Sequence, residues 1–357
     1  MTLCSLLRTH EAEEFHFVLI YSDGWRYHKS NSRRRSSNLE TITIEGVITM
    51  PKKTIPTKRI GILHSGTSGK HDKEYNKFIQ SLKSAGYAQP KNLQITGPLW
   101  AKDDLNALQQ HAKTLASTNP RLDLIVAAGG SASAMAATKE TNAADPVSPI
   151  PVVFTTYFEL NRPAANTTGV CARTSELDPT RLHLLNQRFP AQEVGALVNS
   201  TRPQYNTQKV ELDKEADRLG LELKREDVNR NLGDPATLIK QAFANWRKAG
   251  ITTAIVTADP IFNDYRQDVV KAAQSNNIKA IYQWNEFTDE GGDLSYGTSL
   301  TEAYQLAGTI AGQVLGGADP ASIPVQPLSN IGLVVNRTTA KLIPKALLAG
   351  ARLVRGR

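Results

Sequence analysis

From residue 59 onward, the chain alternates short apolar runs with amphipathic segments, and this alternation limits the folds it can adopt. Residues 60–64 and 122–128 are apolar runs bounded by glycine and polar residues, as in the strands of a buried parallel sheet. Segments 72–85 and 103–115 follow such runs and have helical periodicity. Strands that alternate with helices in this way are typical of βαβ units, so the sequence predicts an α/β fold with parallel sheets.

The same alternation restarts near residue 178, which predicts a second lobe. Asp178-Pro179 and Asp234-Pro235 are each predicted to begin a helix, because aspartate caps free amides and proline suits the first helical position. Ser299 and Glu302 have the spacing of a capping box. Because 357 residues suffice for two hydrophobic cores, we expect two similar, doubly wound parallel-sheet lobes with a ligand cleft between them.

The distribution of charge argues against nucleic-acid binding. The formal net charge is +8, of which residues 1–59 contribute +4 and residues 337–357 contribute +6, so the body between them carries about −2. A nucleic-acid-binding protein more often has a basic stripe across its fold. The two cysteines and seven histidines show no metal-ligand spacing, so no metal or other cofactor is expected.

Residues 1–57 precede the regular pattern and are predicted to be a separate extension. The first apolar run, 15–21, follows three glutamates, which makes a poor secretory signal. Residues 30–37 are rich in serine and arginine and are predicted to be disordered. The extension is therefore interpreted as disordered, or as lying upstream of a true start at Met50, and the sequence leaves export undecided.

The turn Gly129-Gly130-Ser131-Ala132-Ser133 follows an apolar strand and opens a helix. Glycines let a ligand approach the backbone, and amides at a helix N-terminus favour a carboxylate or phosphate. The alternative is a tight turn in which Ser131 or Ser133 caps the helix, and one residue can serve both purposes. A nucleophile elbow would need a downstream histidine, and His183 alone follows, so no enzyme is expected.

Two further turns have a structural and a functional interpretation. Residues 65–69 are rich in hydroxyl groups and either line a cleft or form a solvated turn, since the pattern does not fit a phosphate-binding loop. Asp259, before Pro260, either caps a helix or offers its carboxylate to an ammonium group. The aromatic residues Phe262 and Trp284 either pack on a ligand or belong to the core.

Several short stretches, each weak alone, together match one family over most of residues 59–343. They are Arg59-Ile60-Gly61-Ile62-Leu63, Trp100-Ala101, residues 122–130, Asn161-Arg162-Pro163, Asn166-Thr167-Thr168-Gly169-Val170, Asp259-Pro260-Ile261-Phe262-Asn263 and residues 282–305. The chain resembles the substrate-binding proteins of ABC transporters, whose described members bind tryptophan or tyrosine. This resemblance implies a type I periplasmic-binding fold with two lobes, three crossovers and a ligand in the interlobe cleft.

The resemblance also implies lobe boundaries and partners. The first lobe is expected to comprise residues 58–170 and 286–326, and the second 171–285 and 327–345, with residues 286–297 as the second crossover. The implied partners are a small molecule, most simply an amino acid, and a membrane permease, with periplasmic localisation. The alternative is a cytoplasmic small-molecule sensor on the same fold.

The predicted ligand-binding residues follow the expected strand ends and include several hydroxyl and aromatic side chains. They are Ser65, Thr67, Ser68, Gly130, Ser131, Ala132, Ser133, Thr155, Thr156, Tyr157, Asn199, Asp259, Phe262 and Glu286.

Overall fold

The computed structural model describes residues 4–7, 16–21, 24–29 and 56–355, which fall into two separate units. In the first unit, β1 (Cys4–Leu7), β2 (His16–Tyr21) and β3 (Gly24–Lys29) form an antiparallel sheet in the order β1-β2-β3. The segment 30–37, predicted to be disordered, lies outside the described residues. The second unit contains both predicted lobes.

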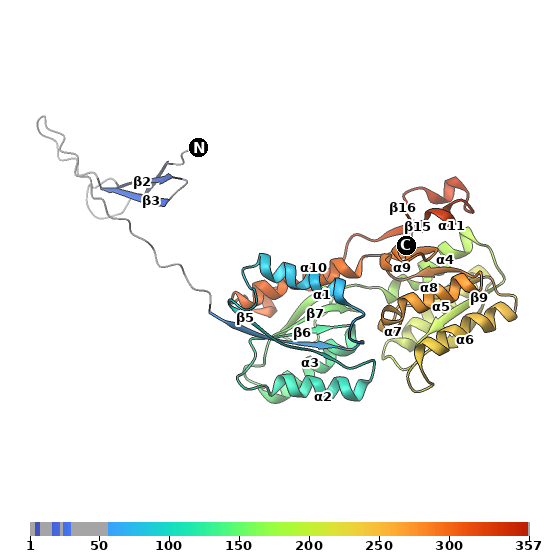
Figure 1. Ribbon diagram of the computed structural model, residues 1–357, viewed down its shortest axis with the longest axis horizontal. Helices are drawn as coiled ribbons and strands as arrows, with labels where there is room; N and C mark the ends of the chain where they lie inside the picture. The colour runs from blue at the N-terminus through green and yellow to red at the C-terminus, as the bar shows by residue number, and fades with distance from the viewer. Residues whose placement is uncertain (1–3, 8–15, 22–23, 30–55, 356–357) are drawn as a thin grey trace, which may run out of the picture. The chain divides into compact units, whose positions relative to one another are not determined.

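The first lobe is built on a parallel six-stranded sheet in the order β14-β8-β7-β6-β4-β5. Its strands are β4 (Lys58–His64), β5 (Leu93–Trp100), β6 (Leu124–Ala128), β7 (Val152–Tyr157), β8 (Thr167–Cys171) and β14 (Gln326–Pro327). Figure 1 shows α1 and α10 on one face of this sheet and α2 and α3 on the other. These helices are α1 (Asp72–Ser84), α2 (Leu105–Ala116), α3 (Ser131–Ala144) and α10 (Leu300–Leu315).

The second lobe is built on a seven-stranded sheet in the order β10-β9-β11-β12-β13-β15-β16. Its first five strands are parallel, whereas β15 runs antiparallel to β13. The strands are β9 (Glu193–Val198), β10 (Glu222–Asp227), β11 (Thr253–Val256), β12 (Lys279–Tyr282), β13 (Leu294–Gly297), β15 (Gly332–Asn336) and β16 (Arg352–Val354).

Helices cover both faces of the second sheet. The cores beneath them separate α4 and α5 on one face from α6 and α8 on the other. The helices are α4 (Asp178–Arg188), α5 (Tyr205–Leu219), α6 (Pro235–Lys248), α7 (Pro260–Asp264), α8 (Arg266–Ser275), α9 (Asn285–Asp289) and α11 (Arg337–Ala340), with short 3₁₀ turns η1 (Ser175–Leu177), η2 (Pro320–Ser322) and η3 (Lys345–Leu348). Two doubly wound lobes of the predicted α/β class are thus confirmed.

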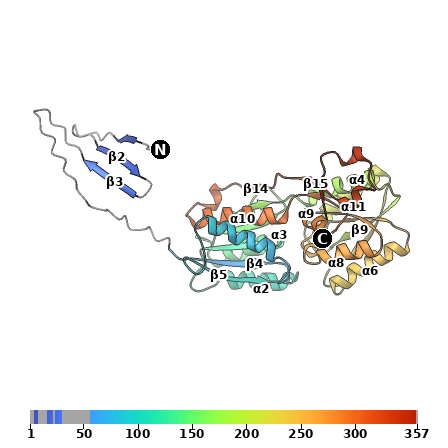
Figure 2. The same cartoon turned by 45° about the horizontal axis from the view of Figure 1, so that its top comes forward.

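Three crossings join the lobes, as expected. The chain crosses after β8, returns between β13 and α10, and crosses again between β14 and β15; Figure 2 shows the last of these segments. The second crossing differs from its predicted place at residues 286–297. Because β13 forms ladder hydrogen bonds with β12 and β15, those residues complete the second lobe and the chain leaves it only after Gly297.

The three aspartate positions expected to cap helices behave differently. Asp234 accepts a hydrogen bond from Thr237 N and caps α6 as predicted, and Asp259 accepts from Ile261 N and caps α7, which was one of the two roles considered for it. Asp178 instead lies inside the first turn of α4, so its predicted capping role is wrong. Its buried carboxylate forms an ion pair with Arg181 at 2.5 Å and accepts a hydrogen bond from Ala258 N.

Arg181 is fully buried and ties together two of the crossing segments. Its Nε donates to the carbonyl of Tyr296 in β13, and its Nη1 donates to the carbonyl of Thr174, both at 2.7 Å. A third donor, Nη2, reaches the carbonyl of Gln283 at 3.3 Å. The first and second crossings therefore share one buried cation, which Asp178 neutralises.

We expect Arg181→Met to lower the free energy of unfolding by about 3–5 kcal/mol, because it leaves the Asp178 carboxylate buried without its partner. Arg173→Met is the matched control, since Arg173 also pairs with an acid three residues away, Glu176, but on the surface. That exposed pair should contribute less than about 1 kcal/mol. Urea denaturation of both variants measures the difference, and equal losses would contradict this role for Arg181.

Candidate functional site

A small pocket lies between the lobes, where the carboxyl ends of their parallel strands face each other. The turns after β4, β6, β7, β11 and β12 all contribute to its lining. Open α/β sheets generally bind their ligands at this end of the strands. The space is about 60 Å³, which holds only a few water molecules.

The first lobe presents the N-terminus of α3 to the pocket. Gly130 and Ser131 line the pocket at the start of this helix, and no side chain caps the free amides there. Gly130 has φ of 105°, and a Cβ atom at this position would lie 2.8 Å from Pro260 Cγ of the other lobe. Glycine therefore allows the two lobes to approach closely, and the helix amides offer a site for a negative group.

The second lobe presents the carboxylates of Asp259 and Asp264 to the pocket, and both are nearly inaccessible to solvent. Asp259 accepts hydrogen bonds from Ile261 N at 2.9 Å and Asn199 Nδ2 at 3.1 Å. Burial raises the pKa of Asp259, while the charge of Arg202, whose Nε lies 3.3 Å from Asp259 Oδ2, opposes this. The capping role and the carboxylate at the cleft, which were alternatives in the sequence, are both present in Asp259.

Asp264 joins the two lobes. Its Oδ2 accepts from Thr67 N at 2.6 Å and its Oδ1 lies 2.5 Å from His71 Nε2, and both partners belong to the first lobe. A Cβ atom at Gly66 would lie 2.5 Å from Asp264 Oδ1, so glycine there lets the carboxylate sit against the loop after β4. His71 lines the pocket, and its buried Nδ1 has no hydrogen-bond partner among the described residues.

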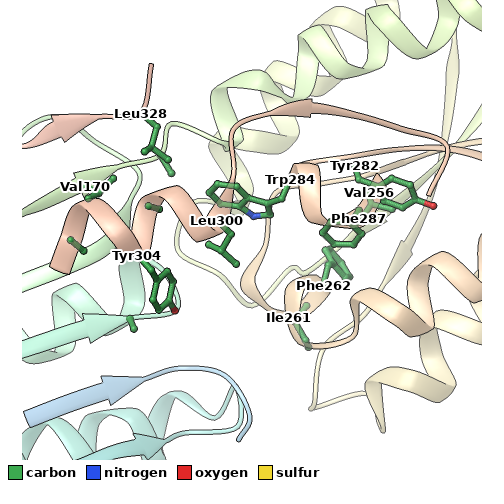
Figure 3. Packing of buried hydrophobic residues seen from close by; sticks show 14 of the residues in the cluster. Val170, Val256, Ile261, Phe262, Tyr282, Trp284, Phe287, Leu300, Tyr304 and Leu328 are labelled. Atoms are coloured by element: carbon green, nitrogen blue, oxygen red, sulfur yellow. The ribbon is translucent and has the colours of Figure 1, made fainter. Parts of the chain in front are cut away.

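Aromatic side chains form a further part of the wall. Tyr157, Trp284 and Tyr304 line the pocket with His64. Figure 3 shows Trp284 beside Leu300, at the crossing from the second lobe into α10, with Tyr304 one turn further along. These rings can pack against an apolar or aromatic group of a ligand.

His64 adopts one tautomer for a structural reason. Burial lowers the pKa of this imidazole well below its usual range, and the neighbouring His71 lowers it further, so His64 is neutral. Its Nδ1 accepts from Gly66 N at 2.9 Å, which leaves Nε2 to donate to the Tyr304 hydroxyl at 2.8 Å. The ring also packs against Trp100, with 4.4 Å between the ring centroids.

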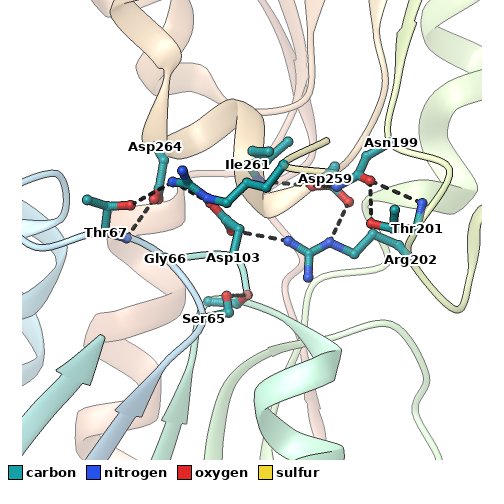
Figure 4. Close-up of polar contacts among 12 residues, drawn as sticks. Ser65, Gly66, Thr67, Asp103, Asn199, Thr201, Arg202, Asp259, Ile261 and Asp264 are labelled. Carbon is teal, nitrogen blue, oxygen red and sulfur yellow. Dashed lines mark hydrogen bonds and ion pairs between the residues drawn. The ribbon is translucent and has the colours of Figure 1, made fainter. Parts of the chain in front are cut away.

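Beside the pocket, Asp103 of the first lobe contacts two arginines of the second (Figure 4). Arg202 Nη2 donates to Asp103 Oδ1 at 3.1 Å, and Arg230 lies 3.7 Å from Asp103 Oδ2. Burial and the nearby Asp264 raise the pKa of Asp103 to about 7, although the two arginines act in the opposite direction. The lobes are therefore joined by buried charged groups rather than by hydrophobic contact alone.

Five of the fourteen predicted ligand-binding residues line this pocket. They are Gly130, Ser131, Thr156, Tyr157 and Asp259.

Of four other predicted residues, three bond to residues of the pocket wall and the fourth does not. The Ser65 hydroxyl donates to the carbonyl of Gly129, and Asn199 holds Asp259. Thr67 binds Asp264 through its amide, while Ser68 is exposed.

The remaining five predicted residues lie outside the pocket lining. Ala132 packs on the core between the sheet and α2 and α3, and the side chains of Ser133 and Thr155 are fully buried. Phe262 is a core residue with no exposed surface, the structural interpretation considered for it. Glu286 contacts the first turn of α10 instead of the pocket.

The Glu286 carboxylate caps α10 from the second lobe. It accepts hydrogen bonds from the Ser299 hydroxyl at 2.6 Å and from Leu300 N and Thr301 N at 3.2 and 3.1 Å. Ser299 accepts from Glu302 N, as the capping box predicted, whereas the Glu302 carboxylate accepts from Asn330 Nδ2 instead of completing the box. Glu286 thus connects α9 of the second lobe to the helix that begins after the second crossing.

Sequence reasoning missed several residues of the pocket wall, among them His64, His71 and Asp264. Metal-ligand spacing gives no signal at the histidines, but His64 ends a strand and His71 directly precedes a helix, and such positions point to a cleft. Asp264 gave no local signal. Within residues 56–355 and the described strands before them, no group of three acidic, histidine or cysteine side chains could hold a metal ion.

Comparisons with known proteins agree on the kind of molecule. A family model described as "ABC transporter substrate binding protein" matches residues 60–351. A protein named "Tyrosine-binding protein" from Clostridioides difficile is 24% identical over 296 residues, covering 80% of this chain and 81% of its own. In the described parts of the chain, no helix is both long and apolar enough to cross a membrane.

Two solved structures share the fold. A conserved domain protein from Vibrio cholerae has a TM-score of 0.69 and 19% identity, covering 83% of this chain and 99% of its own. An ABC domain from Streptococcus pneumonia in complex with L-Trp has a TM-score of 0.67 and 22% identity, covering 84% of this chain and 100% of its own.

We expect Glu286→Gln to lower the free energy of unfolding by about 1–2 kcal/mol, because it weakens the charge-assisted bonds to the first turn of α10. Glu302→Gln, on the same helix, is the control and should change stability by less than about 0.5 kcal/mol. Urea denaturation measures both. If Glu286→Gln kept full stability, the capping role would be wrong, and the predicted role of Glu286 in ligand binding would again be the preferred one.

Proposed function

The chain belongs to the family of ABC transporter substrate-binding proteins, and we propose that it binds an amino acid between its lobes and delivers it to a membrane permease. One observation carries the choice of ligand. The uncapped N-terminus of α3 in the first lobe and the carboxylates of Asp259 and Asp264 in the second line the same pocket. A positive helix end and a negative pair in one pocket suit a ligand with a carboxylate and an ammonium group.

The walls of the pocket favour a ligand with an aromatic side chain. Tyr157, Trp284 and Tyr304 line it, and ring–ring contacts stabilise such a ligand beyond its buried area. The names of the tyrosine-binding relative and of the pneumococcal structure with L-Trp support the same class of ligand. We therefore propose an aromatic amino acid, with tryptophan and tyrosine as the first candidates.

Binding requires the lobes to move. The space of about 60 Å³ is smaller than the pockets that hold small molecules, which are typically about 300–1,000 Å³. In our proposal the lobes separate to admit the ligand and close around it, because the closed form binds it more tightly. The closed protein then docks on a permease, outside the cytoplasmic membrane. Micromolar affinity would correspond to about −8 kcal/mol.

Thermal-shift measurement against the twenty amino acids tests the proposal. We expect tryptophan or tyrosine to raise the melting temperature and sugars to leave it unchanged, because a sugar lacks both charged groups. A cytoplasmic sensor on the same fold is the alternative, and stabilisation by a sugar or nucleotide alone would favour it. Stabilisation by none of the amino acids would contradict the proposed function.

Asp259→Asn should weaken binding of the stabilising amino acid by about 10- to 100-fold, because the ammonium group loses a charged partner. Asp234→Asn is a matched control, since Asp234 also precedes proline and caps a helix, but away from the pocket. Asparagine caps helices as well as aspartate does, so both variants should fold. Isothermal titration calorimetry measures the affinities, and equal affinities of the two variants would argue against an ammonium site at Asp259.

A further inference from the structure

An open groove lies on the second lobe, at the end of its sheet that points away from the interlobe pocket. Lys279, the first residue of β12, lines the groove, whereas Gln283, directly after the last residue of that strand, lines the interlobe pocket. The groove has a volume of about 760 Å³, against about 60 Å³ for the pocket, and the two share no residue. Because only the second lobe contributes to the groove, it is complete whether the lobes are together or apart.

The lining of the groove is strongly positive. Four of its side chains are cationic and one is acidic, so together they carry a net charge of +3. They are Lys279, Arg337, Lys341 and Arg355, with the acid Asp293. Lys279 and Asp293 pair with each other at 3.0 Å. The other three cations are exposed and form no ion pair among the residues that the structure describes, so their charges can act on a ligand.

The acid in the groove does not offset these three charges. Besides Lys279, Asp293 has the Thr339 hydroxyl as a donor at 2.5 Å and the amide of Ala280 at 3.3 Å, and the residue is only 8% exposed. Helix α8 ends at the groove, and a helix C-terminus carries about half a negative charge. Three unpaired cations outweigh that partial charge, so the groove favours an anion.

The types of cation in the groove favour a phosphate group over a carboxylate. Arg337 and Arg355 each carry a planar guanidinium, which can bind two oxygens of one phosphate group. Lys341 adds a compact charge, and the exposed Thr338 adds a hydroxyl donor. A phosphate monoester has about −1.5 to −2 charges and three acceptor oxygens at neutral pH. It can therefore use more of these donors than a carboxylate, which has one charge and two oxygens.

The charge pattern of the sequence agrees with a site at this place. Residues 337–357 contain six basic residues and no acid, although the body before them carries a slightly negative net charge. Arg337, Lys341 and Arg355 belong to this basic segment, and none of its residues lines the interlobe pocket. The binding of an amino acid between the lobes therefore makes no use of the most basic part of the folded chain.

We propose that this groove is a second ligand site, which binds a phosphate group through Arg337, Lys341 and Arg355. The phosphate belongs to a free phosphorylated molecule or to the headgroup of an anionic lipid, and both present the chemistry that the groove recognises. The inference goes beyond the proposed function and does not rest on it, since the groove and the interlobe pocket have no residue in common.

Isothermal titration calorimetry of the full chain with inorganic pyrophosphate at low ionic strength tests the site. We expect pyrophosphate to bind, and sodium acetate at the same concentration to give no binding, because acetate has a single charge. Changing Arg337→Gln and Lys341→Gln together should weaken pyrophosphate binding at least about tenfold, since two charge-assisted contacts are lost.

The double variant Arg247→Gln with Lys248→Gln is the matched control. It removes one arginine and one lysine that are also exposed and also belong to the second lobe, at the end of α6, but that do not line the groove. The two double variants have the same net charge, so a general attraction for anions falls equally in both. We expect the control to bind pyrophosphate like the unaltered protein. Circular dichroism checks that both variants fold.

Co-sedimentation with lipid vesicles distinguishes the two sources of the phosphate. The vesicles contain phosphatidylglycerol and phosphatidylcholine, or phosphatidylcholine alone. If the protein binds only the anionic vesicles, and the groove variant loses this binding while the control variant keeps it, the ligand is a lipid headgroup. If pyrophosphate binds and the vesicles do not, the ligand is a free phosphorylated molecule. Both results support the site.

Three outcomes overturn the inference. The first is that the unaltered protein binds neither pyrophosphate nor the anionic vesicles. The second is an equal loss of binding in the two double variants, which would show general charge attraction without a site. The third is acetate binding as tight as that of pyrophosphate, which would exclude selectivity for phosphate. Failure of every amino acid to bind would contradict the proposed function and leave this inference in place.

Discussion

The contact between Asp103 and Arg202 across the cleft is the interaction on which the site depends. Burial makes each charge costly alone, so the arrangement persists only when the lobes bring both partners together. Arg202 in turn orients Asp259, which caps α7 and lines the pocket. The contact between the lobes and the charge of the pocket therefore depend on the same side chains.

The crossings are bound to this site by a second set of buried polar groups. Arg181 holds the carbonyls of Thr174 and Tyr296, which lie near the first and second crossings. Glu286 holds the first turn of α10 immediately after the second crossing, next to Trp284 in the pocket wall. Of these bonds, those from Glu286 to α10 join the second lobe to the first. The pocket wall and the crossings are therefore connected through these polar contacts.

Much of the fold could be predicted, because apolar residues repeat with different periods in strands and in helices when one face is buried. The strands and helices that were expected between residues 59 and 315 occur in the expected order, whereas strands β8, β13, β14 and β16 were not predicted. Strand β8 is fully buried but reads as a polar stretch of threonine and glycine, and Gly169 is required there because a Cβ would lie 2.2 Å from the Phe154 carbonyl oxygen. Strand β16 has only three residues, too few for a periodic signal.

The candidate site could be predicted only where a local signal marked it. The glycine turn before α3 has such a signal, and Gly130 and Ser131 do line the pocket. By contrast, Asp178 and Asp259 both precede proline, yet one is neutralised inside a helix and the other caps a helix at the cleft. The sequence around an aspartate does not say which arginine reaches it. Arg181 is close to Asp178 along the chain, whereas Arg202 is far from Asp259.

By itself, then, the sequence determined the two lobes, the parallel sheets and the turns that face the cleft, because hydrophobic periodicity and helix-capping residues act over a few neighbouring positions. The tertiary structure decided which polar groups meet. His71 with Asp264 and Asp103 with Arg202 are separated by 193 and 99 positions. Only the contact between the lobes gives these pairs their burial, and no local sequence pattern encodes that contact.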